Sequence, residues 1–280
     1  HWDSQWWGQF GACKEDADGN KFADETKRAE AWKRYERYWT QICDRFKDYS
    51  DHLIFEGANE ELGDRLNDAI YESGYCVPKD DNDTKSISGN LTEYERYEMA
   101  NKINQKFVDI VRSTGGNNAY RHLLIAGYDT NIDKTCDDKF KMPTDTAENG
   151  TTKLSISVHY YTPWDFCGDG GSGIYTQKDK EATETYFTKM DKFYNAGYGI
   201  IMGEFSVCNP KQEGVAQWLN DTMTIAAKHH ILPVLWETNQ YMDKDNCKMR
   251  YNDIAVLYNT ITGSTGDTSS KINTNGTTTD

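Results

Sequence analysis

Residues Leu154–Tyr161 read Leu-Ser-Ile-Ser-Val-His-Tyr-Tyr, a run about as long as one buried strand. Four more runs share its length and its near-continuous hydrophobicity: His52–Glu60, His122–Asn131, Gly199–Ser206 and Ile231–Thr238. Runs of this kind are typical of parallel strands that are covered on both faces. The sequence therefore predicts five parallel strands.

Amphipathic segments separate these runs. Thr92–Arg112 opens with a capping box formed by Thr92 and Glu95 and then carries apolar residues at helical spacing. The same pattern recurs in Ala23–Phe46, Lys180–Asn195, Gln212–His229 and Arg250–Ile261. Regular alternation of strands and helices predicts an α/β domain with a parallel sheet.

Polar side chains gather at the C-terminal ends of the runs. They are Asn59, Glu60, Asp129, Asn131, His159, Tyr161, Glu204, Trp236 and Glu237. In a (β/α)8 TIM barrel the active site is built at that end of several strands. The pattern favours a barrel over a doubly wound sheet, although periodicity alone does not separate the two.

The composition excludes several classes of protein. The 280 residues include 45 acidic and 31 basic ones, and the formal net charge is −14. Nucleic acids and anionic membrane surfaces attract clustered Lys and Arg, so neither is an expected partner. No apolar run approaches the roughly 20 residues of a membrane-spanning helix. Aromatic residues make up 13% of the chain, which excludes wholesale disorder.

Three features suggest a secreted protein. The sequence starts at His1 without a leader, which indicates a processed product or a fragment. Seven cysteines occur without a CxxC pair, which argues against a zinc site and leaves at least one thiol unpaired within the chain. Five glycosylation sequons begin at Asn82, Asn90, Asn149, Asn220 and Asn275. We expect an extracellular glycoprotein.

Residues 263–280 consist almost wholly of Ser, Thr, Asn, Gly and Asp. Such a segment buries little apolar surface, so it is predicted to be a linker tail that leads to a further module. Residues 1–262 are then predicted to form the barrel domain, which is partial at its N-terminus.

Glu60 and Glu204 each follow an apolar run, which places a carboxylate at the mouth of a strand. Two such carboxylates on either side of one sugar bond are what glycoside hydrolysis requires. The alternative is that each is an ordinary exposed glutamate at a strand end.

Four motifs follow one another at the predicted strand ends: Asn59-Glu60 in FEGANE, His159-Tyr160-Tyr161 in VHYYTPWDF, Gly203-Glu204-Phe205 in IIMGEFS and Trp236 in PVLWET. In this order they resemble glycoside hydrolase family 5, the cellulase family, and its broad β-1,4-glucanase and xyloglucanase branch. His1-Trp2-Asp3, followed by Trp6-Trp7, is similar to the end of the family's third strand.

The resemblance implies a role for each motif residue. Glu60 would be the general acid/base and Glu204 the nucleophile of a retaining reaction, with carboxyl groups about 5–5.5 Å apart. Asn59 would bind the sugar 2-hydroxyl, and Tyr161, with His159 beside it, would orient Glu204. Trp236 would lie under the sugar ring, and His1 and Trp2 would contact substrate. No metal or cofactor is needed.

Several of these residues also have structural interpretations. His159 could be a core histidine, and Trp236 could pack in the barrel. Trp2, Trp6, Trp7 and Trp164 could stack on sugars or pack at the rim. Trp32, Trp39 and Trp218 are predicted to lie in the core.

Two departures from the family pattern stand out. Glu237-Thr238-Asn239 replaces the Asp-Asn-Gly expected after Trp236. The five runs would be strands four to eight, so three βα units, on the order of 90 residues, would be missing.

The predicted function is a secreted endo-β-1,4-glucanase that hydrolyses cellulose-type β-glucans. Xyloglucan, mixed-linkage glucan, xylan and mannan are alternative substrates. The alternative from another class is a non-catalytic carbohydrate-binding protein with a truncated barrel.

Overall fold

The structure, a computed structural model, describes residues 4–67, 89–147, 153–237, 239–262, 271–272 and 278–279. The chain divides into two compact units. The first contains residues 1–157 and 196–199, and the second contains residues 158–195 and 200–280. The boundary between them runs through strand β5 (Leu154–Tyr160), so both units contain part of this strand.

All five predicted strands are present. Hydrogen-bonded strands follow the order β3 (Phe55–Glu56), β4 (Leu123–Ala126), β5, β6 (Gly199–Phe205) and β7 (Ile231–Leu235). The β3–β4, β4–β5 and β6–β7 pairs are parallel. The predicted α/β class with a parallel sheet is therefore confirmed. That three further strands precede these five stays a prediction.

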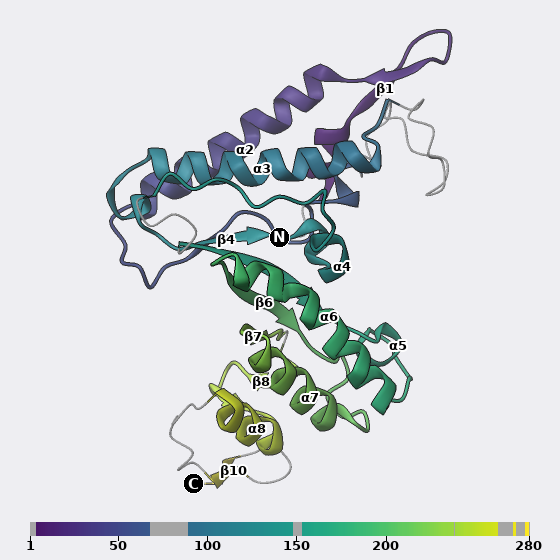
Figure 1. Ribbon diagram of the computed structural model, residues 1–280, viewed down its shortest axis with the longest axis vertical. Helices are drawn as coiled ribbons and strands as arrows, with labels where there is room; N and C mark the ends of the chain where they lie inside the picture. Colours follow the sequence, from purple (N-terminus) through teal and green to yellow (C-terminus); the bar gives the residue numbers. More distant parts are fainter. Residues whose placement is uncertain are drawn as a thin grey trace. The chain divides into compact units, whose positions relative to one another are not determined.

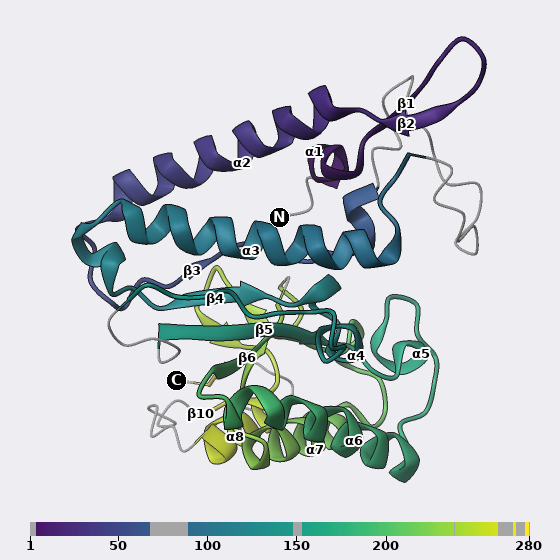
Figure 2. The same cartoon turned by 45° about the horizontal axis from the view of Figure 1, so that its top comes forward.

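The first unit is built around two long helices. Helices α2 (Glu25–Phe46) and α3 (Glu93–Ser113) lie side by side (Figures 1 and 2). The ring of Trp39 on α2 packs 4.5 Å from Phe107 on α3 and 5.8 Å from Phe55 on β3, centroid to centroid. These contacts bury the apolar faces of both helices at the start of the sheet.

Short elements complete the first unit. They are α1 (Ser4–Trp7), the hairpin of β1 (Cys13–Glu15) and β2 (Lys21–Ala23), α4 (Ile132–Thr135), and the 3₁₀ turns η1 (Gly8–Gly11), η2 (Asp64–Asn67), η4 (Gly116–Ala119) and η5 (Tyr128–Thr130).

Side-chain caps determine where the long helices begin. Helix α3 begins after Thr92, which forms the predicted capping box with Glu95. Helix α2 begins at Glu25, later than predicted, because Ala23 belongs to β2 and Asp24 caps the helix. The Asp24 carboxylate accepts two backbone N–H groups of the first turn, which would otherwise lack partners.

Arg121, just before β4, is a buried cation with a structural role. Its side chain is 1% exposed and lies over the ring of Phe55 at 4.6 Å. The guanidinium donates to the carbonyl oxygens of Phe46, Tyr49, Ser50 and Leu53 and to the amide oxygen of Asn118, at 2.6–2.9 Å. One side chain thus binds four backbone carbonyl groups between the end of α2 and the start of β3.

We expect Arg121→Met to lower the free energy of unfolding by about 3 kcal/mol or more, because several buried carbonyl groups lose their donor. Urea-induced unfolding measures this. The control is Arg37→Met, which removes an exposed guanidinium from α2 and should change stability by less than about 0.5 kcal/mol. Equal losses in the two variants would contradict the prediction.

The second unit packs around Trp218. Helix α7 (Val215–Lys228) lies between α6 (Gln177–Asn195) and α8 (Asn252–Thr262). Trp218 on α7 is fully buried, stacks on Tyr160 and Phe205, and donates its Nε1–H to the Thr162 carbonyl at 2.9 Å. The predicted core position of Trp218 is confirmed, whereas Trp32 and Trp39 are only partly buried.

The remaining elements of this unit are small. They are α5 (Trp164–Cys167), the antiparallel pair β8 (Met242–Asp243) and β9 (Lys248–Met249), and a second antiparallel pair, β10 (Lys271–Ile272) and β11 (Thr278–Thr279). The last pair lies in the predicted linker tail, whose role stays a prediction.

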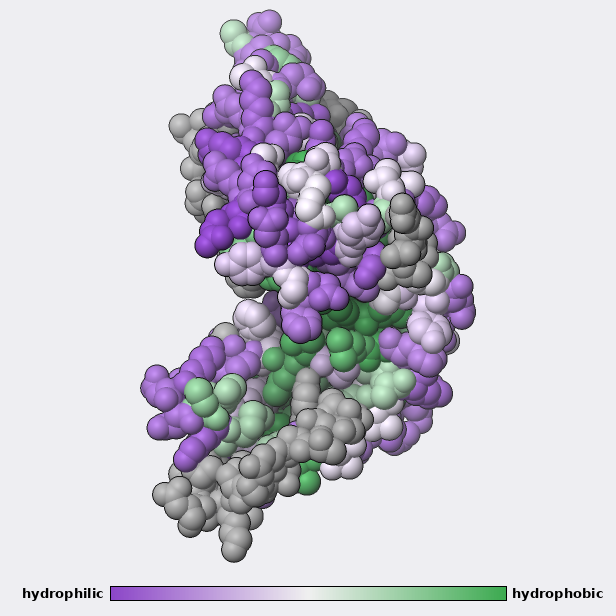
Figure 3. All heavy atoms as spheres, turned by 90° about the vertical axis from the view of Figure 1, so that its left-hand side faces the viewer, coloured by the Kyte–Doolittle hydropathy of each residue, from purple (hydrophilic) through white to green (hydrophobic). Residues whose placement is uncertain are grey.

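The surface shown in Figure 3 is mostly hydrophilic, in keeping with the net charge of −14. None of the described helices is long and apolar enough to cross a membrane. Among the described residues, Cys43, Cys167, Cys208 and Cys247 are free thiols. Asn90 is only 8% exposed, so a glycan on this predicted sequon is incompatible with the fold. Asn82, Asn149 and Asn275 lie outside the described residues.

Candidate active site

Glu204 is buried at the end of β6, beside an irregularity in the β6–β7 register. The two strands pair regularly as far as Met202 and resume at Phe205, with an irregularity between them. Buried and more exposed positions alternate along β6 through Glu204, which lies on the buried side, and the next residue, Phe205, is buried as well. Irregularities of this kind are frequent beside active sites.

Two side chains from β5 and the residue after it hold the Glu204 carboxylate. The Tyr161 hydroxyl donates to Glu204 Oε2 at 2.7 Å, and His159 Nδ1 lies 3.5 Å from the same oxygen. The side chains of His159 and Glu204 are 6% and 11% exposed. A hydrogen bond in so little water is strong and directional. These contacts give the carboxylate a fixed orientation.

Trp236 follows β7, the neighbour of β6. Its backbone N–H donates to the Phe205 carbonyl at 3.0 Å, so the backbone of Trp236 stays paired with the last residue of β6. The side chain is partly buried.

Glu237, where the family pattern has Asp, organises the next loop. Its carboxylate accepts the backbone N–H groups of Asn239, Tyr241 and Met242, the last two at 2.7 and 2.6 Å. Glu237 thus fixes the backbone of this loop.

Asn59 and Glu60 belong to the first unit, in the loop after β3. Both are partly buried. The backbone N–H of Asn59 donates to Glu61 Oε2 at 2.9 Å. Glu61 is 2% exposed, so this buried carboxylate fixes the backbone beside Glu60. No sequence pattern marks this role, because Glu61 looks like one more surface acid in an acidic chain.

The predicted sugar-stacking aromatics fall into three groups. His1 and Trp2 lie outside the described residues. Trp6 and Trp7 are 7% and 6% exposed and pack within an aromatic cluster, which is the structural alternative for these two. Trp164 is 66% exposed, and its ring lies 6.4 Å from that of Tyr161.

Asp129 and Asn131, which are among the polar residues at the ends of the predicted strands, both make structural contacts. Asn131 caps α4 by accepting the Lys134 N–H at 3.1 Å. The Asp129 carboxylate accepts hydrogen bonds from the backbone N–H of Asp64 and from the side-chain ammonium group of Lys134.

Taken together, the fold and site define an α/β protein with a buried carboxylate fixed by tyrosine and histidine where a parallel strand ends. The chain belongs to glycosyl hydrolase family 5, because the family's cellulase model matches residues 1–242. This confirms the resemblance seen in the motifs, and the (β/α)8 barrel is the fold of that family.

Individual relatives support the assignment. Endoglucanase A of Paenibacillus barcinonensis is 33% identical over an alignment of 231 positions that covers 73% of this chain and 52% of that protein. A xyloglucan-specific endo-beta-1,4-glucanase of Bacteroides ovatus is 29% identical over 87% of this chain and 46% of its own length. The solved structure of a family 5 lichenase from Caldicellulosiruptor sp. F32 has a TM-score of 0.66 and 28% identity, over 80% of this chain and 61% of that one. The chain thus spans about half the length of the curated relatives it matches.

Proposed function

We propose that this chain is the catalytic part of a secreted, retaining endo-β-1,4-glucanase. The observation that carries the proposal is the buried Glu204 carboxylate, oriented by the hydroxyl of Tyr161. A nucleophile must hold one geometry toward the anomeric carbon, and a directed hydrogen bond provides it.

In the proposed reaction Glu204 attacks the anomeric carbon while Glu60 gives its proton to the departing glycosidic oxygen. The bond from sugar carbon to that oxygen breaks, and a glycosyl ester on Glu204 forms. Glu60, now ionised, takes a proton from water, which attacks the same carbon and releases Glu204. Two inversions give net retention of configuration.

The other motif residues are proposed to bind the sugar at the cleavage point. Asn59 bonds the 2-hydroxyl, an interaction that strengthens as positive charge develops on the ring. His159 supports Glu204, and Trp236 forms the floor beneath the sugar. His1 and Trp2 contact the same sugar.

Cellulose-type β-glucan is the proposed substrate. The matched relatives are named as an endoglucanase, a xyloglucan-specific glucanase and a lichenase. Xyloglucan is therefore the second candidate and mixed-linkage glucan the third. A neutral polysaccharide suits an acidic protein, since aromatic stacking and hydrogen bonds bind it without charge.

The test is release of reducing sugar from carboxymethyl-cellulose, xyloglucan, mixed-linkage glucan, xylan and mannan by the full-length protein. Proton NMR of the first product reports its anomeric configuration. Binding to these polymers without release of sugar would favour a non-catalytic carbohydrate-binding protein. An inverted first product would exclude the retaining mechanism.

Further chain is proposed to complete a barrel around this sheet. Strand β7 ends the strand order, and its Leu232 and Val234 are 56% and 44% exposed while Ile231 is buried. An apolar face of this kind on a parallel strand is normally covered. A further module attached through residues 263–280 is part of the same proposal.

Trp164 is proposed to stack on a sugar near the cleavage point. One side of its ring packs on Gly168, where a Cβ would lie 2.6 Å from the ring, and 66% of the residue remains exposed. We expect Trp164→Ala to raise KM for the polysaccharide about 5- to 10-fold, a loss of roughly 1 kcal/mol of stacking.

Initial rates over a range of polysaccharide concentrations measure the effect of this substitution. Trp164→Phe keeps an aromatic face and should restore most of the affinity. If Trp164→Ala leaves KM unchanged, the ring packs at the rim without binding sugar.

A further inference from the structure

The loop that carries Asn59 and Glu60 is fastened at its start. Gly57 follows β3, and its N–H donates to the Leu124 carbonyl at 3.2 Å. The Gly57 carbonyl accepts the buried hydroxyl of Tyr35 at 3.1 Å. The backbone three residues before Glu60 is therefore held by both β4 and α2.

A second fastening lies just after Glu60. The Leu62 carbonyl accepts the Asp129 N–H at 2.6 Å, and Asp129 Oδ1 accepts the Asp64 N–H at 2.9 Å. Between these two bonds, a Cβ on Gly63 would lie 2.0 Å from the same Oδ1. Asp129 thus binds the loop backbone on both sides of Gly63, at a distance that only glycine permits.

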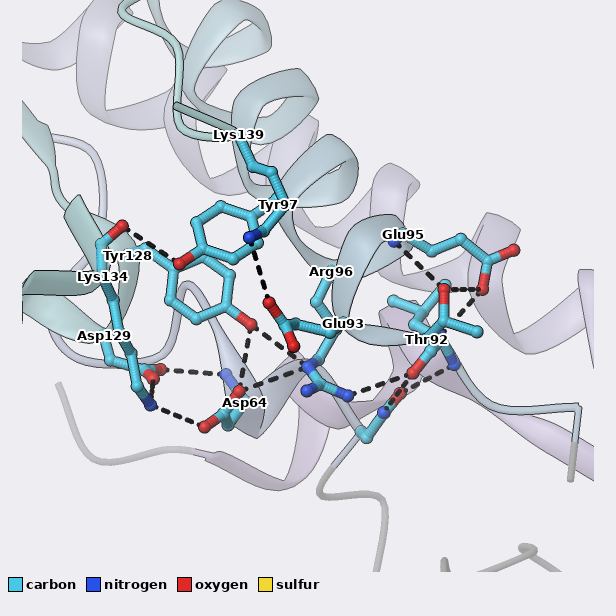
Figure 4. A network of polar contacts seen from close by, with 12 residues as sticks. Asp64, Thr92, Glu93, Glu95, Arg96, Tyr97, Tyr128, Asp129, Lys134 and Lys139 are labelled. Atoms are coloured by element: carbon cyan, nitrogen blue, oxygen red, sulfur yellow. Dashed lines mark hydrogen bonds and ion pairs between the residues drawn. The ribbon is translucent and has the colours of Figure 1, made fainter. Parts of the chain in front are cut away.

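Three more side chains hold the two aspartates, as Figure 4 shows. Lys134 Nζ lies 2.7 Å from both Asp64 Oδ2 and Asp129 Oδ2. The Tyr128 hydroxyl donates to Asp64 Oδ1 at 3.0 Å, and Arg96 Nε lies 3.1 Å from that hydroxyl and 3.2 Å from the carboxylate. These five residues, Asp64, Arg96, Tyr128, Asp129 and Lys134, are called the anchor cluster.

Each member of the anchor cluster comes from a fixed element. Arg96 lies on the first turns of α3, Lys134 lies on α4, and Tyr128 stacks on Tyr97 at 3.9 Å. Asp129 adopts the left-handed backbone conformation, with φ of 50°. Such a conformation persists only where surrounding contacts enforce it.

The anchor cluster is more suited to fixing geometry than to adding stability. The side chains of Lys134 and Asp64 are 41% and 54% exposed, and exposed ion pairs contribute little to stability. Asp129 is different, because its side chain is only 18% exposed. Burial raises the pKa of Asp129 despite the hydrogen bond from Lys134, and the charge of Asp64 adds to the rise.

We propose that the anchor cluster positions the Glu60 carboxyl for proton transfer to the glycosidic oxygen, an inference that rests on the function proposed above. Glu60 lies on a short arch between Gly57 and Leu62, and both ends of the arch are bonded to the body of the first unit. Release of the second end lets the carboxyl move. Displacement of a catalytic group by about 1 Å costs up to about 100-fold in rate.

The test compares two aryl β-cellotriosides in the full-length protein. Phenol is a poor leaving group that needs a proton, whereas 2,4-dinitrophenol departs without one. We expect Asp129→Ala to lower kcat/KM about 10- to 100-fold for the phenyl substrate and less than about 3-fold for the dinitrophenyl substrate. Gly63→Ala pushes the same carboxylate aside without a change of charge and should give the same selective loss.

Lys139→Met is the matched control. Lys139 forms similar ion pairs with Glu93 and Asp137 near the anchor cluster, at 3.2 and 2.8 Å, and its loss should leave both rates unchanged. Melting temperatures establish that each variant is folded. If Asp129→Ala does not fold, the rates of Gly63→Ala test the positioning role instead.

Two failures are distinguishable. Folded variants that lose activity equally on both substrates, or on neither, overturn the positioning role while the proposed function stands. Wild-type protein that cleaves neither substrate removes the proposed function and the positioning role together.

Discussion

Glu204→Gln should abolish turnover, with a fall in kcat of at least about 10⁴-fold on every substrate that the wild-type protein cleaves. An amide is isosteric with the carboxylate but does not attack the anomeric carbon. The loss should be the same for substrates with good and poor leaving groups, because the missing step is bond formation to carbon. Initial rates with aryl cello-oligosaccharides and with soluble polysaccharide measure it.

The substituted site should remain folded and still bind sugar. The carbonyl oxygen of glutamine accepts a hydrogen bond, so the Tyr161 hydroxyl keeps a partner at the position where it now lies 2.7 Å from Glu204. Calorimetric titration with cello-oligosaccharides should show affinity close to that of the wild type. Glu213→Gln, which changes an exposed glutamate of the same unit, should leave activity intact. Persistent turnover in Glu204→Gln would exclude Glu204 as the nucleophile.

The sequence predicted the presence of the five strands more accurately than the residues at which they begin and end. The run Leu154–Tyr161 became a seven-residue strand, whereas the run His52–Glu60 contains only the two-residue strand Phe55–Glu56. The difference follows from Gly57, whose Cβ would meet the ring of Phe107 at 2.9 Å and whose carbonyl bonds a side chain, so that the chain turns away. Hydrophobicity reports burial, but it does not show where pairing ends.

Helix starts were predictable where a side chain marked them. The Thr92 capping box lies where the pattern indicated, because the required residues are three apart in sequence. Helix α7 begins at Val215, later than predicted, because Gly214 has φ of 91° and cannot be helical. Nothing in a hydrophobic pattern records that conformation.

The candidate site was predictable in part for the same reason. Tyr161 and Glu204 are each recognisable within a local motif, and their contact follows from the pairing of parallel strands. The anchor cluster joins residues that are 65 and 70 positions apart, Asp64 with Asp129 and Lys134, through ordinary charged side chains. No local pattern distinguishes these from the other acids and bases of the chain, so only the folded structure reveals them.

Glu60→Ala should produce a different kinetic signature from Glu204→Gln. Without a proton donor, kcat/KM for the phenyl cellotrioside should fall about 10²- to 10⁴-fold, while the dinitrophenyl substrate should react at nearly the wild-type rate in its first step. The glycosyl ester on Glu204 then accumulates, since the carboxylate that activates water is also missing. A rapid burst of dinitrophenol followed by a slow steady state is the expected time course.

Sodium azide should restore the steady-state rate of Glu60→Ala with the dinitrophenyl substrate. The anion fits the space left by the carboxylate and attacks the glycosyl ester without a general base, and the product should be the β-glycosyl azide because configuration is inverted twice. Glu204→Gln should show neither the burst nor this product, because no glycosyl ester forms. If azide leaves Glu60→Ala unchanged, or if the variant loses activity equally on both aryl substrates, Glu60 is not the acid/base, and the positioning role inferred for the anchor cluster fails with it.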